Sequence, residues 1–193
     1  MKITYPYFWK NATQIRKRFY SIAIVFAVAL IAMAIGGLIP LSEQDAITIS
    51  QNLNSTLQEH KASNTLTQYI FLNNFLISLL MFVPVIGAAL GLIILFDTGL
   101  ALSAIASTQG FPVWVGLGSL IVTPVFWLEF AAYSVAMAES IWLFTWLYRS
   151  IVQWRFAGLI RELKWAGIFI GACAGLLILG ALVEVLIINL AAS

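Results

Sequence analysis

Long apolar runs alternate with short polar segments along this 193-residue chain. Each run is long enough to cross a bilayer as an α-helix, which needs about 20 apolar residues. Continuous runs of this length disfavour a closed barrel. The pattern therefore predicts an all-α, polytopic transmembrane helical bundle with about five spans, at residues 21–41, 70–96, 98–123, 125–148 and 165–190.

Helix-breaking residues interrupt two of these runs. Pro84 lies inside residues 70–96 and predicts a kink, because proline removes a backbone donor. Gly110 and Pro112 break residues 98–123. This third run is therefore either a broken span or two half-helices that form a re-entrant hairpin.

Composition places the chain among integral membrane proteins. Hydrophobic residues make up 62% of it and charged residues 9%, against about 25% charged in an average soluble domain. No polar block is long enough to bury a core of its own. Residues 1–193 are therefore expected to form a single helical membrane domain.

Segregated lysines and arginines predict the orientation. Residues 1–20 carry five of them, no acid and several aromatic residues, which predicts a cytoplasmic basic amphipathic segment at the lipid headgroups. Residues 149–164 predict a second cytoplasmic basic connection. The positive-inside rule then gives a multi-pass protein of the cell membrane with its amino end cytoplasmic, its carboxyl end external and residues 98–123 crossing once.

The polar segment at residues 42–69 is expected to be an external loop. Ile49, Leu53 and Leu57 fall on helical spacing, which predicts a helix lying across the outer surface. Asn54 begins an Asn-Ser-Thr triplet, which makes it a candidate glycosylation acceptor on that side.

Four carboxylates lie within the apolar runs, namely Asp97, Glu129, Glu139 and Glu184. A charge at the bilayer centre costs about 2.5–3.5 kcal/mol or more, so each acid needs a partner, a proton or water. By helical rise, Glu129 and Glu184 share an outer layer with Asn73 and Asn74, which predicts an intramembrane polar cluster. One acid there is expected to keep its proton and donate it to a neighbour. Simple interhelical hydrogen bonding is the alternative.

The other two acids have different expectations. Glu139 lies deepest in its span, and Arg149 is too far along the same helix to pair with it. We expect Glu139 to be protonated or bonded to hydroxyls, with Ser103, Thr123, Ser134 and Ser140 as candidates. Asp97 is expected to be an inner-face acid that caps a helix starting at Thr98.

Glycines recur at four-residue spacing in two runs, Gly87 with Gly91, and Gly167 with Gly171 and Gly175. Such ridges let helices approach closely. The second run offers a homo-oligomer interface, although packing within one chain is the favoured interpretation.

The residue inventory argues against catalysis. His60 is the only histidine and Cys173 the only cysteine, so a multi-histidine metal site, a disulfide and a buried Ser-His pair are not expected. A phosphate-binding Gly-Lys-Ser or Gly-Lys-Thr loop is missing from the sequence. The expectation is no enzyme activity, no cofactor, no metal and no nucleic-acid partner.

Three segments resemble the stage II sporulation protein M family. They are Phe71-Leu72-Asn73-Asn74-Phe75, Asp97-Thr98-Gly99 and Pro124-Val125-Phe126-Trp127-Leu128-Glu129. In that family the matching positions read Phe-x-x-Asn-Asn, Asn-Gly and Pro-His-Gly-x-x-Glu, so Val125 and Phe126 replace a His-Gly pair. The Asn74 and Glu129 positions carry over. The resemblance implies a polytopic membrane protein, and the bacterial namesake belongs to a membrane complex.

The leading functional prediction is a non-enzymatic scaffold or permease-like subunit of a membrane complex, with the bilayer and other membrane proteins as partners. The alternative is a small proton- or ion-coupled carrier in which Glu129, Glu139 and Glu184 relay protons.

Overall fold

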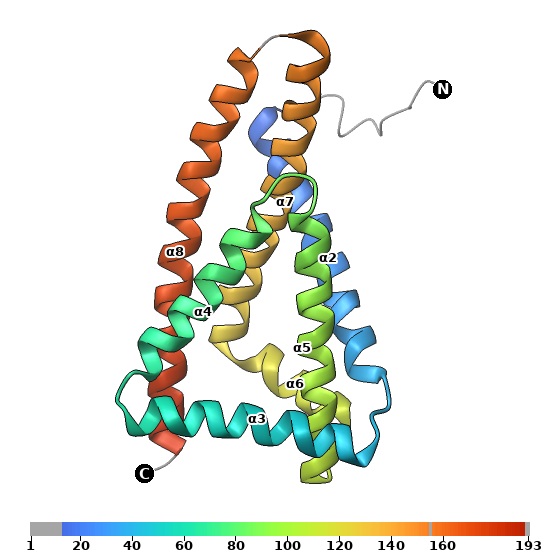
Figure 1. Ribbon diagram of the computed structural model, residues 1–193, viewed down its shortest axis with the longest axis vertical. Helices are drawn as coiled ribbons and strands as arrows, with labels where there is room; N and C mark the ends of the chain where they lie inside the picture. The colour runs from blue at the N-terminus through green and yellow to red at the C-terminus, as the bar shows by residue number, and fades with distance from the viewer. Residues whose placement is uncertain (1–12, 155, 192–193) are drawn as a thin grey trace.

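The computed structural model describes residues 13–154 and 156–191, and every regular element in that part of the chain is a helix (Figure 1). This confirms the predicted all-α class. Most of the basic segment expected at residues 1–20 lies outside the described residues. The helices are α2 (Gln14–Leu38), α3 (Glu43–Ala62), α4 (Leu66–Met81), α5 (Gly87–Gln109), α6 (Val113–Val122), α7 (Pro124–Gln153) and α8 (Ala157–Ala191).

Four of the described helices, α2, α5, α7 and α8, are long and apolar enough to cross a membrane. They run along the long axis of the molecule, and the turn between α7 and α8 lies at the same end as the start of α2 (Figure 1). α3 lies across the opposite end, where the sequence predicts a surface helix. α4 is apolar but shorter, with 16 residues and a length of about 24 Å.

The second apolar run is two helices, so the prediction of one span over residues 70–96 is wrong. α4 ends at Met81, the chain reverses through residues 82–86, and α5 runs back toward the end of the molecule where α4 begins, diverging from α4 (Figure 1). Val85 takes a left-handed conformation with φ of 76° in this turn. Ser140 on α7 donates a hydrogen bond to the Val83 carbonyl at 2.6 Å. The expected kink at Pro84 is therefore a complete reversal, held against α7.

The prediction that a helix starts at Thr98 is also wrong, because α5 continues through this position to Gln109. α5 ends where Gly110 adopts φ of 73° and donates its backbone N–H to the Ala106 carbonyl. Pro112 then precedes α6. The predicted break near Gly110 and Pro112 is present, but it separates α5 from the short α6 instead of dividing one span.

Glycines bring α2 and α5 into direct backbone contact. A Cβ added to Gly99 would lie 2.0 Å from the Met33 carbonyl oxygen, and one added to Gly36 would lie 2.0 Å from the Phe96 carbonyl oxygen. Neither position accepts a larger residue unless the helices separate. Close approach of this kind is the usual role of small residues between membrane helices.

The two glycine runs singled out in the sequence behave differently. A Cβ on Gly91 would lie 2.4 Å from the Met137 sulfur, so this glycine packs within the chain. Gly167, Gly171 and Gly175 are exposed, and a Cβ at any of them would meet nothing within 4 Å. The favoured interpretation, packing within one chain, is therefore wrong for this second run.

Candidate functional site

A cavity of about 460 Å³ lies among the helices, at the level where the sequence predicts a polar cluster. Its polar lining comes from α4, α5, α7, α8 and the residue that precedes α7, and consists of Asn73, Asn74, Thr98, Thr123, Glu129, Tyr133 and Glu184. All four members of the predicted cluster, two amides and two carboxylates, thus face one space. We call this space the acidic cavity.

Two amides and one carboxylate form a chain of hydrogen bonds along one wall. Asn74 Nδ2 donates to Glu129 Oε1, and Asn73 Nδ2 lies 3.4 Å from Asn74 Oδ1. These contacts join α4 to α7 and fix the direction in which the Glu129 carboxylate points.

The path of α8 brings Glu184 to the same space. Gly180 is buried against α7, and a Cβ there would lie in ordinary contact with the Glu129 side chain, 3.5 Å from its Cγ. Glu184 follows one helical turn later and so lies on the same face of α8. The structure gives Glu184 no hydrogen bond or ion pair to another residue in the described part of the chain.

Tyr133 is a cavity residue that sequence reasoning missed. It lies one turn after Glu129 on α7, and only 7% of it is exposed. No hydrogen bond joins its hydroxyl to another described residue, although the side chain lines the cavity. Its position in the sequence could have identified it, because Tyr133 follows Glu129 by four residues and positions i and i+4 share a helix face.

The side chains that line the cavity include carboxylic acids but no basic group to balance them. Of the residues that line the cavity, Glu129 and Glu184 are the only ones with a carboxylic acid, and none is lysine, arginine or histidine. The remaining walls are apolar and include Met33, Phe126 and Phe130. Such a space favours a cation and disfavours an anion.

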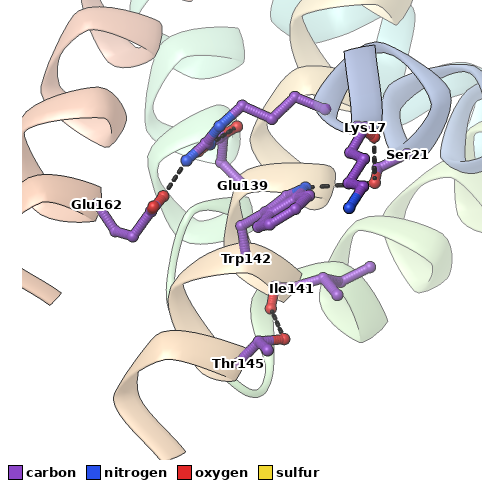
Figure 2. A network of polar contacts seen from close by, with 8 residues as sticks. Lys17, Ser21, Glu139, Ile141, Trp142, Thr145 and Glu162 are labelled. Carbon is purple, nitrogen blue, oxygen red and sulfur yellow. Dashed lines mark hydrogen bonds and ion pairs between the residues drawn. The ribbon is translucent and has the colours of Figure 1, made fainter. Parts of the chain in front are cut away.

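Glu139 has a cationic partner, so the expectation of a protonated or hydroxyl-bonded acid is wrong. Arg18 on α2 donates through Nη1 to both Glu139 carboxylate oxygens and through Nη2 to Glu162 on α8. All three residues are buried, with 4%, 1% and 1% exposed. Glu139 and Glu162, which are labelled in Figure 2, come from two different helices, α7 and α8. We call these three residues the arginine lock.

Aromatic rings enclose the arginine lock. The Arg18 guanidinium carbon lies 5.1 Å from the ring centre of Trp142 and 5.7 Å from those of Trp165 and Phe169. Trp142 Nε1 donates to Ser21 Oγ at 3.2 Å, which adds a second link between α7 and α2 (Figure 2). The planar, weakly hydrated guanidinium suits this setting, because it pairs with carboxylates and stacks on rings at once.

Asp97 lies near the middle of the 23-residue α5, and its side chain is exposed. The prediction of an inner-face cap is therefore wrong. The carboxylate does not line the acidic cavity. An exposed acid halfway along a helix of membrane length requires water or a partner outside the described residues.

The other residues singled out in the sequence lie away from this site. His60 stacks on Tyr69 with ring centres 4.0 Å apart, at the corner between α3 and α4. Cys173 is buried, and Asn54 is exposed on α3. Among the described residues, no three His, Cys, Asp or Glu side chains are grouped as a metal site requires.

The fold and the cavity together define an all-α protein with helices of membrane length. Comparison of the chain with protein-family models, with curated proteins and with solved structures finds no match. The chemistry of the acidic cavity and of the surrounding helices is therefore the best guide to the function of this protein.

Proposed function

We propose that this protein is a non-enzymatic, permease-like subunit of a membrane complex, and that it admits a cation to the acidic cavity. The observation that carries the proposal is the pair of carboxylates, Glu129 and Glu184, in a cavity whose lining contains no basic side chain. A binding site for a positively charged solute needs this charge balance.

Asp97 supports the complex. Its exposed carboxylate at mid-helix would cost about 2.5–3.5 kcal/mol in lipid, and a polar or cationic residue of a neighbouring subunit would remove that cost. The resemblance to the stage II sporulation protein M family points the same way, because its namesake belongs to a membrane complex.

The proposed topology keeps five crossings and a cytoplasmic amino end in the cell membrane, with new boundaries for the second and third crossings. α2, α4, α5, α7 and α8 would cross, with α4 short and tilted. The basic residues Arg149, Arg161 and Lys164 lie on or near the turn between α7 and α8, at the end of the molecule where α2 begins, and the positive-inside rule puts this end in the cytoplasm.

Affinity purification from the native membrane in mild detergent tests the complex. A stoichiometric protein partner is expected with the tagged chain, and Asp97→Asn should lose it, whereas Glu59→Gln, which changes an exposed acid on α3, should retain it. Recovery of the chain without any protein partner would contradict the complex.

Reconstitution into liposomes tests the cation site. Dye-reported entry of monovalent inorganic or organic cations should occur with the wild type and fall sharply in Glu184→Gln, whereas Glu59→Gln should remain active. Absence of flux for all cations, together with absence of cation binding, would contradict the permease-like function.

A carrier that acts alone is the second candidate, and the 16-residue α4 favours it, since unusually short apolar segments often mark transport sites. In that case a proton relay would use Glu129 and Glu184 only. Glu139 is held by Arg18 and does not line the acidic cavity. The open glycine stripe at Gly167, Gly171 and Gly175 would suit contact between two copies.

A further inference from the structure

The volume of the acidic cavity identifies the size of its ligand. A bare inorganic cation takes about six to eight oxygen ligands at about 2.3–2.6 Å, and so occupies a small fraction of about 460 Å³. Cavities of about 300–1,000 Å³ are typical of organic ligands. The space therefore fits a small organic molecule.

The polar groups in the cavity differ in whether they already have a hydrogen-bond partner within the protein. Glu129 already accepts a hydrogen bond from Asn74. Glu184 and the Tyr133 hydroxyl have no partner among the described residues, although Tyr133 is only 7% exposed. Because Tyr133 lines the cavity, a ligand bound there can donate a hydrogen bond to its hydroxyl. The Glu184 carboxylate on α8 and the Tyr133 hydroxyl on α7 are thus available to accept hydrogen bonds from a ligand.

The remaining walls indicate the rest of the ligand. Phe126 and Phe130 stack on each other with ring centres 4.9 Å apart, and both line the cavity with Met33 and Leu120. These side chains offer apolar contact, and the aromatic faces also attract a cation. A fully polar or strongly hydrated ion would leave this surface unused.

We propose that the acidic cavity binds a protonated organic amine with an apolar body. The ammonium donates to Glu184, Glu129 and the Tyr133 hydroxyl, and the apolar body packs on Phe126 and Phe130. The inference rests on the proposed cation site and specifies its ligand class. Three properties of the cavity together select this ligand class: the excess of acidic over basic side chains, the hydrogen-bond acceptors without a partner and the apolar walls.

Calorimetry on the full chain in lipid nanodiscs tests the inference. The probes are phenethylammonium, cyclohexylammonium and hexylammonium chlorides, with 2-phenylethanol as the neutral counterpart of the first and sodium chloride as the inorganic cation. At least one ammonium is expected to bind more tightly than the alcohol and sodium. Glu184→Gln should weaken that binding at least tenfold, because a charge-assisted hydrogen bond is lost.

Two further variants complete the design. Tyr133→Phe should weaken the ammonium severalfold, because it removes only the hydroxyl, whereas Glu43→Gln at the start of α3 should leave binding unchanged. Protection of the buried Cys173 thiol from a maleimide shows that each variant is folded.

The outcomes separate the two proposals. Sodium binding that depends on Glu184, with no ammonium bound, overturns the amine inference and leaves the cation site standing. Equal binding of the alcohol and the ammonium, unaffected by Glu184→Gln, overturns the amine inference as well. Failure of all cations to bind overturns both.

Discussion

Removing the cation of the arginine lock is the most direct test of how the three helices are joined. Arg18→Met deletes the guanidinium and keeps an unbranched apolar stem of similar length. Glu139 and Glu162 then remain, each 1% exposed, as two neighbouring carboxylates without their partner. The variant therefore combines lost ion pairs with uncompensated buried charge.

The expected loss of stability is large. Removing one partner of a buried ion pair typically costs about 3–5 kcal/mol, and here one cation serves two acids. The aromatic contacts of Arg18 add about 0.5–2 kcal/mol. For a chain of this size about 1 kcal/mol shifts the melting temperature by about 2–4 °C. The two terms together make about 3.5–7 kcal/mol, so Arg18→Met should melt about 7–28 °C below the wild type.

The single cysteine supplies the assay. Cys173 is 1% exposed and so reacts with a fluorogenic maleimide only when the bundle opens. Heating the protein in detergent with this dye records the melting of each variant. The matched control is the triple variant Arg18→Met, Glu139→Gln and Glu162→Gln, which removes all three charges. Its melting temperature should return most of the way to the wild type, because neutral groups replace the buried charges.

Two results would refute the reasoning. One is a melting temperature for Arg18→Met within about 2 °C of the wild type, since less than 1 kcal/mol would then be at stake. The other is a triple variant as unstable as the single one, which would mean that contact of the guanidinium with its aromatic neighbours, and not its pairing with the two acids, joins the helices.

Three further predictions use the same melting assay. Gly99→Ala should lower stability by about 1–3 kcal/mol, because its Cβ would lie 2.0 Å from the Met33 carbonyl oxygen. Gly175→Ala, whose Cβ would lie in open space, should be neutral or slightly stabilising. Equal effects of the two substitutions would contradict the close contact between α2 and α5. Val85→Gly should be neutral or raise stability by up to about 1–3 kcal/mol, because φ of 76° strains a β-branched residue, and a clear loss of stability would argue against that conformation. In folded wild-type protein below its melting temperature, Cys173 should react with the maleimide far more slowly than in protein heated above that temperature. Rapid labelling of the folded protein would contradict the burial of Cys173.

Local pattern predicted the helical class and the shared level of the cavity residues. Asn74, Glu129 and Glu184 lie near the ends of their apolar runs, and counting helical rise from each end places them at one depth. The depth of a residue along its own helix does not depend on which helices are neighbours. Counting helical rise therefore brings these residues to one layer, and the structure adds that they face the same cavity.

Contacts between distant parts of the chain were beyond this reasoning. Arg18 and Glu139 are 121 positions apart, and no local pattern links them. The charge pattern assigned Arg18 to a cytoplasmic segment, so the arginine was not considered as a partner for an acid in a span. The helix reversal at residues 82–86 was missed for another reason. An apolar run containing one proline looks the same whether the helix kinks or turns back.

The arginine lock also has a consequence for the order of synthesis. Arg18 emerges from the ribosome in α2, whereas its partners Glu139 and Glu162 emerge more than a hundred residues later. On the proposed topology, α2 enters the membrane with an unpaired arginine near its amino end, which reaches back toward the headgroups on its long stem. Only when α7 and α8 arrive does that side chain turn inward. On this topology the bundle is completed late in synthesis, when α7 and α8 bind the Arg18 side chain of α2.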